Sequence, residues 1–350
     1  MKKASKINKI IINTIPSLLA VLGALFVGSI IILFIGENPI EAYKAMYNGS
    51  FGNIKALANT LQRATPYIFG ALSFLIAANA GLFNIGIEGQ MYMGAIFASI
   101  IGFSVTGLPK ILHLPLTLVV SMLGGMMWAY IPALLKVKRG VHEVISTVML
   151  NYVAFALTGY LTVHVFHEPG LVAQTFKVNS TSILTELVAT SKLNTGFLIG
   201  IILSIIIFIF LFYTPWGYNV RVNGFNSRVS PYAGINNKRI MLLSMISSGA
   251  FAGLIGAERV LGVYQRFIHS FSPGYGFTAI AVGLLGKNHP LGIIPAAILF
   301  GALETGGVAM SLQVDVPREL GLILQALIIV FIASAQFISK KLVKMDERVK

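Results

Sequence analysis

Polar residues interrupt this apolar chain at one short motif, Asn84-Ile-Gly-Ile-Glu-Gly-Gln90. Apolar runs lie on both sides of it, from Leu72 to Phe83 and from Met91 to Val105. Inside a bilayer, exposed backbone groups and carboxylates are costly, and interrupted helices tend to occur where a polar molecule is bound or passes. The motif therefore predicts a polar path or a partner contact within a membrane, with Asn84, Glu88 and Gln90 as candidate path residues.

Further polar residues recur at helical spacing downstream. Glu143, Thr147 and Asn151 are four residues apart, so they share one face of a helix. We expect Thr147 and Asn151 to line or gate the same path. Glu143 fits equally well as a residue of the first helical turn after His142.

A second interruption, Gly286-Lys-Asn-His-Pro290, separates a short apolar run from the next one, which carries Glu304. Two interrupted apolar segments in one chain favour a transport site. The alternative, that both are interfacial turns with helix caps, remains open, and Glu304 is kept as a path candidate.

The sequence offers little for enzyme chemistry. His164 and His167 could share a metal ion, but no third ligand of a suitable type lies nearby. Gly286-Lys287 resembles the end of a phosphate-binding loop, yet Ala281 and Asn288 replace the first glycine and the final Ser/Thr. We expect neither a metal site nor ATP hydrolysis in this chain.

The composition identifies the class of protein that must position these residues. Of the 350 residues, 56% are hydrophobic and only 11% are charged, with a mean hydropathy of +0.81. Soluble domains carry about 25% charged residues. With no cysteine in the chain, disulfides and thiolate metal sites are excluded. The chain is therefore predicted to be one all-α, polytopic membrane domain over residues 1–350.

Apolar runs long enough to cross a bilayer occur about ten times, and some of them are short or broken. The expected spans are 10–35, 65–83, 88–105, 115–135, 143–166, 196–213, 239–262, 276–287, 290–310 and 318–338.

The net charge of +14 is distributed unevenly between the segments that connect these spans. Most of the basic residues fall on the side that holds both termini, which places the termini in the cytoplasm. The basic excess thus orients the chain in the membrane, and we expect no nucleic acid partner. The longest cytoplasmic connection, about 215–238, is predicted to be a folded docking element, whereas Asn194 is expected in an outer loop.

A run of small residues from Ser247 to Gly256 marks a helix that others approach closely. Gly249 and Gly253 are four apart, as are Ser248, Ala252 and Gly256, which favours tight helix contacts. Packing within the chain is the expected use of this run, and a subunit interface is the alternative.

Three of these motifs together resemble one family. The motif 84–90 with Met-Tyr-Met-Gly-Ala95, and the late motif Ala281 to Gly292, are similar to membrane permeases of bacterial ABC importers in the ribose/branched-chain-amino-acid superfamily. The segment Gly140 to Tyr152 resembles the subgroup that carries nucleosides. The resemblance implies a type II ABC importer fold in a bacterial plasma membrane.

The same resemblance gives a role to the cytoplasmic connection. Arg221-Val-Asn-Gly224, Asn226 and Tyr232-Ala-Gly234 resemble the coupling segment through which such permeases contact their ATPase. Pro231 departs from the family pattern and is compatible with a helix only in its first turn.

By resemblance, the partners are ATPase subunits that bind ATP and Mg, a second permease subunit expected to be a different chain, and an extracellular substrate-binding lipoprotein. Nucleosides are the leading substrate. A neutral nucleoside needs no counter-charge deep in the membrane, which agrees with the expected lack of Arg or Lys in the middle of a span. A sugar or another small polar solute would fit as well. An ion-coupled secondary transporter using Glu304 or Glu88, and an intramembrane enzyme, are further alternatives.

Overall fold

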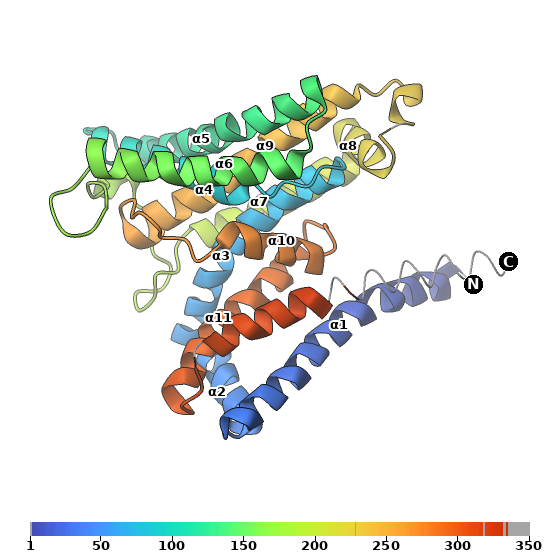
Figure 1. Cartoon of the computed structure of the whole chain (residues 1–350), viewed down its shortest axis with the longest axis vertical. Coiled ribbons are helices and arrows are strands. Elements are labelled where there is room, and N and C mark those ends of the chain that lie inside the picture. Colours follow the sequence, from blue (N-terminus) through green and yellow to red (C-terminus); the bar gives the residue numbers. More distant parts are fainter. Residues whose placement is uncertain (1, 228, 318, 332–333, 335–350) are drawn as a thin grey trace. The chain divides into compact units, whose positions relative to one another are not determined.

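The computed structural model describes residues 2–227, 229–317, 319–331 and 334. The basic tail from Lys340 and the end of the last expected span lie outside the described residues. The chain forms two compact units, one made of residues 1–60 and 299–350 and the other of residues 61–298. Both units are helical in the part that the structure describes (Figure 1).

The first unit contains α1 (Lys2–Ile35), α2 (Pro39–Phe51), the start of α3 (Ile54–Asn79) and the end of α11 (Ile293–Gln313). Gly36 ends α1 with φ +96°, and the chain from Leu19 to Ile35 meets α2 at a bend of 118°. The Asn38 side chain caps α2 by accepting from the amide of Ile40. α2 then packs on α11, where Ser50 Oγ donates to the Ala302 carbonyl oxygen at 2.7 Å.

The second unit is built around α4 (Ile87–Ser104), α5 (Lys110–Arg139), α6 (Glu143–Tyr160) and α9 (Asn237–Glu258). These helices pack side by side (Figure 1). Glycines make the close approach possible. A Cβ on Gly253 would lie 2.4 Å from the Ser121 carbonyl oxygen of α5, and one on Gly256 would lie 2.4 Å from the Met91 carbonyl oxygen of α4. The small-residue run is therefore used for packing within the chain, as predicted.

Two helices of this unit end in a wider turn. α6 continues into the π-helix η1 (Leu161–Val165), and α9 continues into the π-helix η4 (Arg259–Tyr264). Such turns are rare in helices and are often found at functional sites.

Both predicted interruptions are present, but the first lies four residues earlier than expected, because residues 87–90 of the motif form the first turn of α4. Residues 80–86, hereafter the first break, separate α3 from α4. Residues 286–292, hereafter the second break, separate α10 (Tyr275–Leu285) from α11. Lys287 and Asn288 adopt left-handed backbone conformations there, with φ of +57° and +52°.

The connection predicted at 215–238, hereafter the docking segment, is folded. It follows α7 (Gly196–Tyr213) and consists of α8 (Pro215–Phe225) and the short 3-10 helix η3 (Ser230–Ala233), ahead of α9. Thr214 Oγ1 caps α8 by accepting from the Gly217 amide at 3.1 Å. Pro231 lies in the first turn of η3, where proline removes no hydrogen bond of the helix.

Each of the ten expected spans overlaps a helix. Among the described residues, five helices are long and apolar enough by themselves to cross a membrane, or six if the bent pair of α1 and α2 counts as one span. The five are Lys110–Arg139, Glu143–Val165, Gly196–Tyr213, Asn237–Tyr264 and Ile293–Gln313. Tyr275–Leu285 and Glu319–Phe331 are shorter apolar helices. The chain is thus a multi-pass, all-helical membrane protein. α4 is not among the five, because Glu88 and Gln90 in its first turn make it less apolar. Most of its residues are buried by neighbouring helices.

Two polar groups of this unit are buried with partners from the protein. Arg259 lies near the end of the apolar helix Asn237–Tyr264, with only 2% of its side chain exposed. It is tolerated because Glu258 Oε2 accepts from its Nε at 2.5 Å and the Gln62 carbonyl oxygen accepts from its Nη2 at 3.1 Å. Asn194 lies in the connection before α7, where it is buried, and its Nδ2 donates to Glu258 Oε1 at 2.9 Å.

Candidate functional site

The first break is held by a buried amide network. Asn84 Nδ2 donates to Gln90 Oε1 at 2.9 Å and to Ser248 Oγ of α9 at 2.8 Å. The Asn84 Oδ1 accepts from the Gly86 amide at 2.8 Å. Ser248 in turn donates to the Ser73 carbonyl oxygen of α3 at 2.8 Å. Asn84 and Gln90, both path candidates, therefore connect the break to α4, α9 and α3.

Asn151 joins α6 to the same break. Its Oδ1 accepts from the Gly89 amide at 2.8 Å, and its Nδ2 donates to the Ile85 carbonyl oxygen at 3.0 Å. Gly89 lies in the first turn of α4, where backbone amides have no partner within the helix. Asn151 thus acts as a cap for α4, supplied from another helix. A Cβ on Gly89 would lie 2.8 Å from Asn151 Oδ1, so only glycine leaves room for this contact.

Thr147 is fully buried one turn before Asn151. Its Oγ1 donates to the Glu143 carbonyl oxygen at 2.7 Å, within α6. A Cβ on Gly86 would lie 3.0 Å from the Thr147 Cβ, so Thr147 packs directly against the first break. It contributes shape there, while its hydroxyl is used by its own helix.

Glu88 bridges two helix N-termini. It lies in the first turn of α4, and its Oε2 accepts from the Gly276 amide in the first turn of α10 at 2.6 Å. The Ser272 side chain also hydrogen-bonds this carboxylate. Helix N-termini carry partial positive charge, so a carboxylate placed between two of them is stabilised. Glu88 therefore ties the break that starts α4 to the helix that precedes the second break.

Glu143 begins α6, as the capping alternative predicted. Its Oε2 pairs with Lys136 at 2.7 Å, and its Oε1 accepts from the Phe83 amide at 3.4 Å. It is thus both a first-turn residue and a contact of the first break. Glu304 belongs to the other unit, where it is partly buried on α11.

The second break contacts the end of α3 and an aromatic pair. Asn79 Nδ2 donates to the Asn288 carbonyl oxygen at 3.2 Å. The His289 ring lies 5.4 Å from the Phe208 ring and 5.2 Å from the Phe212 ring, centroid to centroid. Burial in this apolar setting lowers the pKa of His289 below its ordinary value of 6.5, so its imidazole is neutral near pH 7.

The chemistry available at the first break is that of neutral hydrogen bonding. Asn84, Gln90 and Asn151 carry no charge, and Glu88 is occupied by backbone and hydroxyl donors. Among the residues that the structure describes, no three metal-ligand side chains come together. This arrangement fixes the start of α4 through contacts with α6, α9 and α10.

The docking segment presents large exposed side chains. Phe225 at the end of α8 is 95% exposed and Tyr232 on η3 is 91% exposed. Asn226 follows α8 as its C-cap and is exposed, and Gly234 ends η3 with φ +73°. Side chains exposed to this extent make this segment a candidate surface for contact with a protein or with the membrane.

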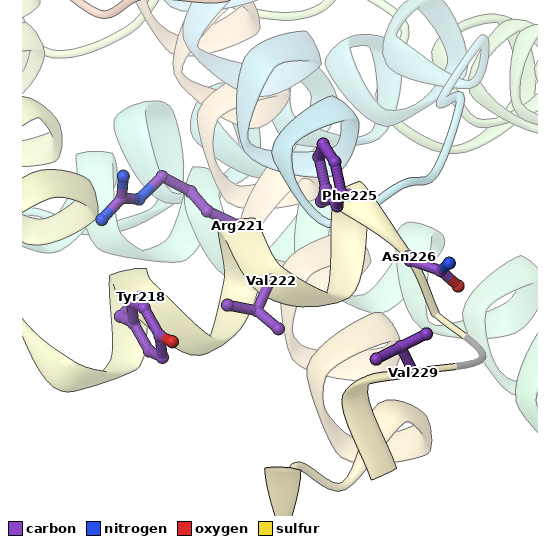
Figure 2. A pocket seen from close by; sticks show the side chains of 6 residues that line it. All are labelled: Tyr218, Arg221, Val222, Phe225, Asn226 and Val229. Atoms are coloured by element: carbon purple, nitrogen blue, oxygen red, sulfur yellow. The ribbon is translucent and has the colours of Figure 1, made fainter. Parts of the chain in front are cut away.

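A hollow of about 230 Å³ opens between α8 and the start of η3. Figure 2 shows its lining, with Val229 facing the last turns of α8 and Arg221 extending away from Val229. The Arg221 guanidinium lies 4.9 Å from the centre of the Phe212 ring, which supports it by a cation–π contact. The lining residues are Tyr218, Arg221, Val222, Phe225, Asn226 and Val229.

Of the sequence candidates for the coupling contact, Arg221, Asn226 and Tyr232 lie at this surface. Gly224 faces inward, where a Cβ would lie 2.2 Å from the Asn79 carbonyl oxygen. Sequence reasoning missed Ser73 and the Glu258–Arg259 pair. Asn223 lies within the predicted coupling motif and Ser248 within the small-residue run, but neither was predicted to bond the first break.

Comparison with known proteins identifies the family of this chain. The family described as "Branched-chain amino acid transport system / permease component" matches residues 56–333. The chain is 36% identical to the guanosine ABC transporter permease protein NupP of Bacillus subtilis, over 93% of this chain and 96% of that protein. It is 36% identical to the nucleoside ABC transporter permease protein NupB of Lactococcus lactis, over 90% and 89% respectively. It is 31% identical to the glucose ABC transporter permease protein TsgB13 of Haloferax volcanii, over 94% and 91%. No solved structure matches the chain.

Proposed function

Since the chain belongs to the family of branched-chain amino acid transport system permease components, and is a transport subunit of an ABC importer rather than an enzyme, we propose that its substrate is a nucleoside, with guanosine as the first compound to test. The observation that carries this proposal is the 36% identity, over nearly the whole chain, to permeases named for guanosine and for nucleosides. The 31% identity to a permease named for glucose keeps a sugar as the second candidate.

The chemistry of the first break supports a neutral substrate. Asn84, Gln90, Thr147 and Asn151 are uncharged, and the buried charges of Glu258 and Arg259 are paired with each other. A nucleoside brings hydroxyl and ring nitrogen groups that such amides can bind without a counter-charge. These four residues, with Glu88 and Glu304, are the residues we assign to the substrate path. Because all three amides are bonded within the protein, we assign them to gating rather than to direct binding in this conformation.

We assign the docking segment to the contact with an ATPase subunit. Arg221, Asn226 and Tyr232 supply its exposed side, while Gly224 and Gly234 shape its backbone. ATP and Mg would be bound by that partner. A rigid helix pair that carries exposed aromatic side chains is suited to receive a push from a moving subunit.

The assembly we propose contains two ATPase subunits, a second permease chain and an extracellular substrate-binding lipoprotein. Bacillus subtilis has two relatives of this chain, NupP and a second guanosine ABC transporter permease protein, NupQ, which is 28% identical over 74% of this chain. This supports a pair of different permease chains.

For the membrane arrangement we propose ten crossings of a bacterial plasma membrane with both termini in the cytoplasm. The excess of basic residues on the side of the docking segment supports this orientation. We treat residues 1–350 as one permease domain, because the family match at 56–333 includes parts of both compact units.

The experiment that tests this proposal is purification of the tagged chain from its native membrane, followed by identification of the bound proteins and of the ligand of the associated lipoprotein. We expect an ATPase subunit, a second permease and a lipoprotein that binds guanosine. A lipoprotein that binds glucose and ignores nucleosides would replace the substrate, and a chain purified without any ATPase would refute the assembly. Tyr232→Asp is the matched variant, since it places a charge on the exposed docking surface and should reduce ATPase recovery only.

A further inference from the structure

α8 rests directly on the first break through its last turn. Asn223 is buried, and its Nδ2 donates to the Ala80 carbonyl oxygen at 2.8 Å. At the next residue, a Cβ on Gly224 would lie 2.2 Å from the Asn79 carbonyl oxygen and 3.0 Å from the Gly81 amide nitrogen. Gly81 has φ +80°, and its own Cβ would lie 3.2 Å from the Gly224 Cα. The two backbones are therefore in contact, with no side chain between them.

The Asn223 amide is also held from the docking segment. Ser230 Oγ of η3 lies 3.2 Å from Asn223 Oδ1 and also within hydrogen-bond distance of Asn237 Oδ1, and its single proton is donated to one of these two oxygens at a time. The Oδ1 atom of Asn223 thus contacts η3, and its Nδ2 atom contacts the first break. This division means that the two contacts can be separated by substitution, because aspartate keeps the oxygen and loses the donor.

From Ala80 the chain enters the polar network at once. The Phe83 amide donates to Glu143, and Asn84 bonds Gln90 and Ser248, as described above. At the end of α3, Asn79 Nδ2 donates to the Leu75 carbonyl oxygen at 2.8 Å and to the Asn288 carbonyl oxygen at 3.2 Å. The contact of α8 therefore lies at the point where the chain connects to both breaks.

We propose that Asn223 is the positioning residue that makes α8 and the first break move as one body, so that a displacement of the docking segment reaches the residues that gate the path. The proposal rests on the proposed function. It adds the place where motion enters the membrane helices, namely the Ala80 carbonyl group and the Gly81–Gly224 contact. A buried hydrogen bond between close-packed backbones transmits displacement because packed contacts are not continuously deformable.

The test is Asn223→Asp in the complete assembly, reconstituted with its ATPase, partner permease and binding protein. Three quantities are measured: the ATPase recovered with the chain, the rate of ATP hydrolysis, and the amount of guanosine taken up per ATP hydrolysed. We expect ATPase recovery and hydrolysis to be unchanged and uptake per ATP to fall by about tenfold, the size of effect that loss of one buried hydrogen bond produces. Asn48→Asp introduces the same charge at an exposed position on α2, outside the docking segment, and should leave the ratio unchanged.

Uptake per ATP equal to that of the unchanged protein would overturn the proposal. So would a parallel loss of ATPase recovery and uptake, because Asn223 would then serve docking or folding rather than transmission. Asn223→Ser, which shortens the side chain without adding a charge, is the second variant if the aspartate does not reach the membrane. It removes both the Ala80 contact and the Ser230 contact, and it should likewise lower uptake per ATP. Failure of the proposed function is seen separately, as absent guanosine uptake in the unchanged assembly.

Discussion

Asn151 offers the sharpest test of the polar network, because one side chain satisfies two backbone groups of another element. Asn151→Leu keeps the side-chain size and removes both contacts, leaving the Gly89 amide and the Ile85 carbonyl oxygen without this partner. Each buried group left unsatisfied costs about 1–3 kcal/mol. Hydrogen bonds in membrane proteins average nearer about 0.6 kcal/mol. We therefore expect the free energy of unfolding to fall by roughly 2–4 kcal/mol, towards the lower part of the summed range.

We expect Asn151→Leu to reduce guanosine uptake strongly even at low temperature, where the variant is still folded. If α4 loses its cap, its start is no longer fixed, and an energy change of about 2–3 kcal/mol in a gating equilibrium alters its population by roughly 30- to 150-fold. The assay is uptake of radiolabelled guanosine by the reconstituted assembly, together with thermal unfolding of the purified chain in detergent. Asn151→Asp keeps the acceptor for the Gly89 amide. We therefore expect it to lower the free energy of unfolding by about half as much as Asn151→Leu does.

The matched control is Asn48→Leu, the same substitution at an exposed position on α2. We expect it to change neither uptake nor unfolding. If Asn151→Leu behaves like Asn48→Leu in both measurements, the first break does not depend on Asn151, and the assignment of a gating role to the network is wrong.

Three further predictions concern packing, buried charge and pH. Gly253→Ala places a Cβ 2.4 Å from the Ser121 carbonyl oxygen and should lower the free energy of unfolding by about 1–3 kcal/mol. Gly23→Ala, whose nearest contact would be 3.6 Å away, should not lower it. Equal thermal unfolding of the two variants would contradict the close packing of α9 and α5. Glu258→Gln leaves the charge of the Arg259 guanidinium uncompensated and should lower the free energy of unfolding by about 3–5 kcal/mol. The double change Glu258→Gln with Arg259→Met should recover most of this loss. A double variant no more stable than the single one would show that the two charges do not act as a pair. Because burial lowers the pKa of His289, the unfolded chain binds a proton more readily than the folded one. The free energy of unfolding should therefore fall as the pH drops from 7 through 6.5 towards 5, and part of this pH dependence should disappear in His289→Gln. An identical pH profile for the variant would show that His289 does not contribute.

The sequence predicted the elements and the residues of the first break better than the contacts between them. The spacing of Thr147 and Asn151 correctly predicted a polar buried face on α6, because helical periodicity is a local property. The glycines of 84–90 correctly predicted an interrupted helix. Which groups Asn151 would satisfy could not be predicted, since Ile85 and Gly89 are brought to it only by the packing of α4 against α6.

Long-range contacts explain what local patterns could not predict. The burial of Asn194 could not be predicted from its place in the connection before α7, because its partner Glu258 is 64 residues away in the sequence. Asn223 and Ala80 are far apart in sequence, and nothing in either local pattern indicates the other.

We conclude that this chain is the permease subunit of an ATP-driven nucleoside importer. The decisive measurement uses liposomes that contain the chain with its partner permease and ATPase, supplied with the binding lipoprotein outside and ATP inside. We expect uptake of guanosine that requires ATP and the ATPase, that unlabelled nucleosides inhibit, and that glucose leaves unchanged. Uptake by the chain alone on a proton or sodium gradient, with no dependence on ATP, would show instead that the chain is a secondary transporter.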